Sequence, residues 1–209
     1  MSYYFFKTKL FEWLEQRKVE KSFYGNDRFR KQDQALLAAY RNENPYQISK
    51  QYMIRKGAEN PYVYGETPLT TMAKIARECN LGPEDTVIEM GAGRGRAALF
   101  LAEYVGCHVI AYEWIPTFVK KMVSCKKLKM FAQDMFSADY SEATAIYLYG
   151  TMLEDPAIVQ LIEKFPQNAK ILTVSYPLNA YSAAYGIRKT LSGRFPWGKT
   201  EIYWNERNT

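Results

Sequence analysis

One stretch of the sequence decides the fold: Val87-Ile88-Glu89-Met90-Gly91-Ala92-Gly93-Arg94-Gly95-Arg96. Its apolar start predicts a buried β-strand, and the three alternating glycines predict a sharp turn into a helix that begins at Arg96. Because glycine has no Cβ, such a turn can approach a ligand closely, and the first amides of the helix face that ligand. The stretch therefore predicts a ligand site at the end of the first strand of an α/β sheet.

Two kinds of ligand use such a turn, and the sequence separates them. A dinucleotide-binding turn has the pattern Gly-x-Gly-x-x-Gly, but Arg96 occupies the third glycine position here. Glu89, two residues before the first glycine, would also repel a pyrophosphate. S-adenosylmethionine has no phosphate and carries a sulfonium and an ammonium group, so the same carboxylate favours it. The turn thus predicts S-adenosylmethionine as the cofactor.

Two further acidic residues lie in register with the turn, at the ends of the next two predicted strands. Glu113 can accept hydrogen bonds from both ribose hydroxyls. Asp134, followed by Met135 and Phe136, offers an acceptor for the adenine amine beside an apolar wall, and Trp114 offers a second wall by stacking. One acidic residue at a strand end is most often a solvated loop residue, but three in register with a glycine turn indicate a site.

The chain divides into two parts at about residue 60. Residues 1–60 have aromatic residues at helical spacing and predict a helical extension, whereas residues 61–209 alternate short apolar runs with amphipathic segments, which is typical of βαβ units. We expect a Rossmann-like α/β sheet that is mostly parallel and ends in an antiparallel hairpin. The predicted strands are 86–89, 108–113, 129–132, 145–149 and 170–175, the hairpin is 186–194 with 201–204, and the predicted helices are 68–79, 96–105, 115–126 and 156–165.

The basic character of the chain belongs to the extension. The formal net charge is +6, and residues 1–60 supply +5 of it, with 12 Lys and Arg against 7 Asp and Glu. Such a charge favours nucleic acid, an anionic membrane surface or an acidic protein as a partner. Three widely spaced cysteines without a secretory signal or spanning segment predict a cytoplasmic protein. A single histidine disfavours a metal site and Ser-His chemistry.

Four further segments accompany the glycine turn: 61–68 (PYVYGETP), 147–152 (YLYGTM), 175–178 (SYPL) and 198–204 (GKTEIYW). With Glu89, Glu113 and Asp134, they make the chain from residue 61 onward resemble the class I S-adenosylmethionine-dependent methyltransferases. Within that class it is similar to the small lysine methyltransferases that modify the adenine nucleotide translocase and the ATP synthase c subunit, and more distantly to the non-SET histone lysine enzymes. Those relatives carry a hydrophobic membrane-anchoring segment before the fold, where this chain has an aromatic but charged extension.

The resemblance implies methyl transfer to a protein lysine. It also implies that Tyr64, Glu66 and Thr67 lie over the methionine end of the cofactor and that residues 149–151 border the methyl group. The signature Asn-Pro-Pro-Tyr is absent after the fourth strand, which disfavours methylation of a base amine. The predicted cofactor-binding residues are Tyr64, Glu66, Thr67, Glu89, Gly91, Ala92, Gly93, Gly95, Glu113, Trp114, Asp134, Met135 and Tyr149.

A lysine must lose its proton before it can attack, which costs roughly 4 to 5 kcal/mol at neutral pH from a pKa near 10.4. A desolvated channel with aromatic walls would lower that pKa. Tyr64, Tyr149 and Tyr176 are the candidates for this channel, because a hydroxyl can orient the amine while the ring excludes water; each is otherwise a half-buried strand-end tyrosine. Two alternatives stay open: an RNA or small-molecule methyltransferase that uses the extension as a clamp, and a non-catalytic scaffold whose aromatic helix docks on a partner or membrane.

Overall fold

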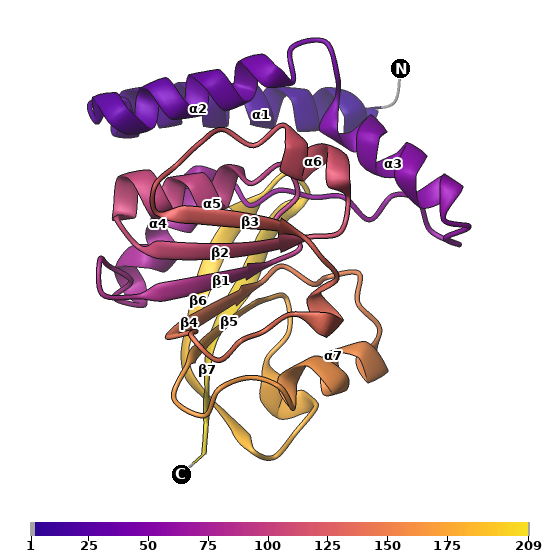
Figure 1. Ribbon diagram of the computed structural model, residues 1–209, viewed down its shortest axis with the longest axis vertical. Coiled ribbons are helices and arrows are strands. Elements are labelled where there is room, and N and C mark those ends of the chain that lie inside the picture. The colour runs from indigo at the N-terminus through magenta and orange to yellow at the C-terminus, as the bar shows by residue number, and fades with distance from the viewer. Residues whose placement is uncertain (1–2, 209) are drawn as a thin grey trace.

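The computed structural model describes residues 3–208, and it describes side chains from residue 6 onward. Residues 1–2 of the predicted extension and residue 209 of the predicted α/β part lie outside this range. Seven strands form one sheet in the order β3-β2-β1-β4-β5-β7-β6 (Figure 1). Strands β1 to β5 are parallel, and β7 is antiparallel to both β5 and β6. The predicted Rossmann-like sheet with a C-terminal hairpin is therefore confirmed. The strands are β1 (Thr86–Met90), β2 (His108–Glu113), β3 (Leu128–Ala132), β4 (Ala145–Leu148), β5 (Lys170–Val174), β6 (Tyr185–Phe195) and β7 (Gly198–Arg207).

Helices precede the sheet and cover both of its faces. Two asparagines cap helices of the extension: the Asn26 side chain accepts a hydrogen bond from the Phe29 amide, and Asn44 accepts one from the Tyr46 amide. The helices are α1 (Tyr3–Phe23), α2 (Asp27–Ala39), α3 (Pro45–Arg55), α4 (Leu69–Glu78), α5 (Arg96–Phe100), α6 (Pro116–Lys120) and α7 (Asp155–Ile162), with a π-helical turn at Leu101–Val105 and 3-10 turns at Met135–Ser137 and Leu178–Ala180.

Each strand places alternate side chains in one of two cores. Val87 belongs to the core beneath α4 and α5, and its neighbour Ile88 belongs to the core beneath α7; both are fully buried. Because parallel strands are covered on both faces, only their ends are open to ligands. The carboxyl ends of β1 to β4 are therefore where the fold offers a site.

The extension packs against the sheet-covering helices and shares their core. Phe23 of α1 and Phe29 of α2 contact Phe100 of α5, with ring centroids 4.9 and 5.3 Å apart. Figure 1 shows α1 and α2 together at one end of the molecule. The outward face of α1 leaves apolar side chains exposed, including Phe6 (67%) and Trp13 (55%). Among residues 3–208, no helix has the length and apolar character needed to cross a membrane.

Three predicted boundaries are wrong. The helix predicted at 115–126 ends at Lys120, because Met122, Val123 and Cys125 pack against the core from a non-helical segment. The helix predicted to reach residue 165 ends at Ile162. The hairpin is longer than predicted, since Phe195 still pairs with Gly198 and only residues 196–197 form the turn.

Candidate active site

The glycine turn has the geometry that its sequence predicts. Gly91, Gly93 and Gly95 have φ values of +69°, +58° and +78°, which lie in the left-handed region that side chains rarely adopt. A Cβ on Gly93 would lie 2.9 Å from the Tyr64 ring, and a Cβ on Gly95 would lie 2.7 Å from the Met122 sulfur. The turn therefore requires glycine both for its backbone conformation and for the approach of these neighbours.

A cavity of about 310 Å³ lies where the turn meets the carboxyl ends of β1 to β4. Eight of the predicted cofactor-binding residues line it: Tyr64, Gly91, Gly93, Glu113, Trp114, Asp134, Met135 and Tyr149. Glu66, Thr67, Glu89 and Ala92 line a smaller space of about 20 Å³ that shares Gly91 and Tyr149 with the main cavity. Gly95 lines neither space and instead packs on Met122.

Glu113 ties the glycine turn to the end of β2. Its Oε2 accepts a hydrogen bond from the Gly93 amide and its Oε1 accepts one from the Ile115 amide, both at 2.8 Å. Burial raises the pKa of the Glu113 carboxyl to about 7, against the lowering effect of these amides. The carboxyl group therefore has a fixed position on the cavity wall, as binding of a ribose diol requires.

Glu89 is buried without a full set of partners. It is 5% exposed, and its Oε2 has no hydrogen-bond partner among the residues that the structure describes. Burial, together with the nearby Glu113, raises the pKa of its carboxyl to about 8. A carboxylate in such a place is stable only beside a cation. The ammonium group of S-adenosylmethionine meets this requirement, so the residues present fit that cofactor.

The predicted adenine-binding residues all line the main cavity. Asp134 is exposed, and its Oδ1 accepts a hydrogen bond from the Phe136 amide, which caps the 3-10 turn that carries Met135. Trp114 is 43% exposed, and its ring is edge-on to Tyr52 with centroids 5.6 Å apart. These side chains give the cavity an acceptor and two apolar walls.

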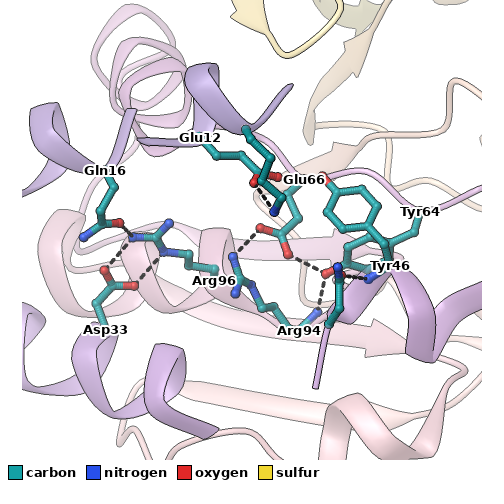
Figure 2. A network of polar contacts seen from close by, with 10 residues as sticks. Glu12, Gln16, Asp33, Tyr46, Tyr64, Glu66, Arg94 and Arg96 are labelled. Atoms are coloured by element: carbon teal, nitrogen blue, oxygen red, sulfur yellow. Dashed lines mark hydrogen bonds and ion pairs between the residues drawn. The ribbon is translucent and has the colours of Figure 1, made fainter. Parts of the chain in front are cut away.

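Residues 63–67, which we call the strap, cross over the glycine turn and are held there by Arg94 (Figure 2). The Arg94 guanidinium lies 2.7 Å from Glu66 Oε2, and the Tyr64 hydroxyl donates to Glu66 Oε1 at 2.5 Å. Burial and the neighbouring Glu66 raise the pKa of Tyr64 well above its usual value. The Thr67 hydroxyl is hydrogen-bonded at 2.5 Å to Tyr147. All three side chains predicted over the methionine end, those of Tyr64, Glu66 and Thr67, are thus engaged by the protein itself.

Sequence reasoning missed three contributions to the site. Arg94 fills a variable position of the glycine motif, so no pattern marked it. Ser49 and Met53 of α3 line the cofactor cavity, although none of the predicted cofactor-binding residues lies in the extension. Arg96 is paired with Asp33 of α2, which is fully buried, through two contacts of 2.7 Å (Figure 2). The extension therefore contacts both the cavity and the turn.

The three channel tyrosines have different positions. Tyr64 and Tyr149 line the cofactor cavity, and burial raises the pKa of both. Tyr176 does not line it; its hydroxyl lies behind Gly150, 2.8 Å from where a Cβ on that glycine would be, and is buried without a hydrogen-bond partner among residues 3–208. Within the same range, no three His, Cys, Asp or Glu side chains are placed to hold a metal ion.

Comparisons with known proteins agree with this geometry. A family model described as "Histone methylation protein DOT1" matches residues 50–117, which run from α3 through the strap and the glycine turn to the start of α6. No curated protein sequence matches the chain. An RNA methyltransferase from Salinibacter ruber, solved with S-adenosyl-L-homocysteine, is 20% identical, with a TM-score of 0.57 over 69% of this chain and 95% of its own.

Two more solved structures are similar. A candidate RNA methyltransferase from Pyrococcus horikoshii is 16% identical, with a TM-score of 0.56 over 78% of this chain and 98% of its own. A mutant of MtNAS in complex with S-adenosylmethionine is 11% identical, with a TM-score of 0.57 over 92% of this chain and 77% of its own. That coverage exceeds what residues 61–209 alone contain, so it includes much of the extension. The chain therefore has the class I methyltransferase fold, and the family match supports an S-adenosylmethionine-dependent enzyme.

Proposed function

We propose that this protein is an S-adenosylmethionine-dependent methyltransferase that modifies a lysine side chain of another protein. The observation that carries the proposal is the pair of buried carboxyls beside a left-handed glycine turn: Glu113 lines the main cavity, and Glu89 lines the small space that shares Gly91 and Tyr149 with it. The match of residues 50–117 to a histone-methylation family supports a protein as the acceptor.

Two buried cysteines, Cys79 and Cys107, are unpaired, which supports a cytoplasmic location.

The residues of the cavity would act by binding and positioning. When bound, the cofactor supplies a methyl group activated by a sulfonium. Glu113 would accept the ribose hydroxyls, Glu89 would pair with the ammonium group, and Asp134 would accept from the adenine amine. Because the leaving group departs neutral, no acid is needed to assist it, and orientation accounts for most of the rate. Tyr64 and Tyr149 would exclude water from the acceptor amine.

RNA is the second candidate acceptor. Two of the similar structures are described as RNA methyltransferases, and residues 1–60 carry a net charge of +5. Several of these cations are already paired with carboxylates, as in Arg28 with Glu103 and Arg30 with Asp27. Such pairing lowers the charge available to phosphates. A small molecule remains a further acceptor class for the same cofactor site.

The acceptor can be identified directly. The full-length protein is incubated with methyl-labelled S-adenosylmethionine and with separate protein and RNA fractions of its native cell extract. Methyl-lysine in acid hydrolysates of the protein fraction supports the proposal, whereas label released only by ribonuclease supports the RNA alternative. If calorimetry detects no binding at cofactor concentrations up to the millimolar range, and the Glu113→Ala variant gives the same result, only the non-catalytic scaffold remains.

A further inference from the structure

A second cavity, of about 260 Å³, adjoins the cofactor cavity. The two share Tyr64 and Gly65 of the strap as a common wall. On its other sides the second cavity is bounded by Lys7 of α1, Tyr46 of α3 and Trp197 of the β6–β7 turn. It therefore lies between the N-terminal helices and the C-terminal hairpin, next to the site already described.

The wall between the two cavities is thin at Gly65. A Cβ on Gly65 would lie 2.7 Å from the Tyr149 hydroxyl, so the strap backbone rests directly on that ring. Tyr149 follows β4 and lines the cofactor cavity. At this point the strap backbone separates the second cavity from Tyr149, the residue that borders the methyl group in the proposed function. For a group in the second cavity to reach the cofactor, the strap backbone at Gly65 must move aside.

Trp197 has an unusual place in this cavity. It is 49% exposed, yet its ring lies parallel to Tyr149, with an interplanar angle of 4° and centroids 5.8 Å apart. It also stacks on Phe195, which is 1% exposed, at 4.7 Å. Two rings therefore fix its orientation while about half of its surface stays open. An exposed tryptophan held rigidly beside a cavity is typical of a binding residue.

We infer that the second cavity admits the acceptor, and that Trp197 and Tyr46 bind the alkyl part of a lysine side chain; this rests on the proposed methyltransferase function. Aromatic walls bury the methylene groups and exclude water. The carboxylate in the wall, Glu66, already has both oxygens engaged by Tyr64 and Arg94, so it adds no unpaired charge. Such surroundings favour the neutral amine that the reaction needs.

The same lining disfavours a nucleotide. Among the residues that the structure describes, Lys7 is the only cation in the lining, whereas nucleic acid binding depends on several phosphate contacts. One face of Trp197 is already covered by the protein's own rings, so a base could not be sandwiched there.

In the expected step, the lysine Nζ lone pair forms a bond to the methyl carbon as the carbon–sulfur bond breaks, and the electron pair stays on sulfur. The surplus proton leaves the methylammonium product to water.

Trp197→Ala tests this inference against a matched variant, Trp13→Ala, which removes a tryptophan of similar exposure (55%) from the outer face of α1. The rate of lysine methylation is measured against the concentration of the extract's protein fraction, and cofactor affinity is measured by calorimetry. For Trp197→Ala we expect an apparent KM raised about tenfold or more, with cofactor affinity within about twofold of wild type. Trp197→Phe should restore most of the loss, which would not follow from misfolding.

The outcomes separate the two proposals. Wild-type methylation of lysine with equal KM values for the two Ala variants overturns the cavity inference alone. Wild-type methylation of RNA, and not of lysine, overturns the lysine proposal and with it the inference. A Trp197→Ala protein that has lost cofactor binding would place Trp197 in the cofactor site and also contradict the inference.

Discussion

Replacing Glu89 with glutamine is expected to change how cofactor affinity depends on pH. Burial and Glu113 raise the pKa of the Glu89 carboxyl to about 8, so in the ligand-free protein it is a neutral acid below that pH. Pairing with an ammonium group requires this carboxyl to lose its proton. Because binding then releases one proton, the wild-type affinity for the cofactor should increase about tenfold for each unit by which the pH rises toward this pKa.

Glutamine resembles the neutral acid in shape and cannot ionise, so the variant lacks this dependence. Between about pH 5.5 and pH 7 an α-amino group stays protonated, and the ligand's own titration does not interfere. The ratio of the wild-type affinity to the variant's affinity should therefore rise by about 30-fold between the lower and the higher pH.

Isothermal titration calorimetry with S-adenosylmethionine measures this difference. Repeating each titration in buffers of different ionisation enthalpy counts the protons released on binding. Glu142→Gln, at an exposed carboxyl remote in sequence from the turn, is the control and should follow the wild type. Equal pH dependence in Glu89→Gln and wild type would show that Glu89 does not pair with the ammonium group.

Three other substitutions test separate parts of the site. Glu113→Gln should weaken cofactor binding by about 10- to 150-fold in calorimetry, because hydrogen bonds to a charged group contribute about 1.5 to 3 kcal/mol. Asp33→Asn, which breaks a fully buried ion pair, should lower the free energy of unfolding in urea by about 3 to 5 kcal/mol, whereas Asp27→Asn at an exposed pair should change it by less than about 1 kcal/mol. Gly65→Ala would place a Cβ 2.7 Å from the Tyr149 hydroxyl and should slow methyl transfer by up to about 100-fold in the labelling assay, with the far-UV circular dichroism spectrum unchanged.

The sequence was sufficient where the chemistry is local. The alternation of Gly91, Gly93 and Gly95 predicts a left-handed turn because only glycine adopts that backbone without strain, and all three have positive φ. Glu113 and Asp134 could be placed because the ends of parallel strands meet at one edge of the sheet. The spacing of apolar residues predicts which segments form strands and which form helices, because it reflects which side chains are buried.

What the sequence could not supply depends on contacts between distant segments. Asp33 and Arg96 are 63 residues apart, and nothing in either local pattern indicates that they pair. Trp197 lies in the turn of the predicted hairpin, but its stacking on Tyr149 depends on how the hairpin folds back along β5. The end of α6 was misjudged for the same reason, since Met122 leaves the helix to pack beneath Gly95.

The N-terminal helices cannot be regarded as an appendage to the cofactor fold. Arg96 is the first residue after the glycine turn, and its guanidinium is only 13% exposed. Removing α2 would take away its carboxylate partner, and leaving one charge of a buried ion pair without its partner is strongly destabilising. Removing α3 would also take Ser49 and Met53 from the cavity wall. A truncated protein would therefore lose stability and cofactor binding together, whatever the extension does for the acceptor. Only substitutions of exposed cations that have no partner among the described residues, such as Lys18 and Lys21 of α1, can isolate what its positive charge contributes.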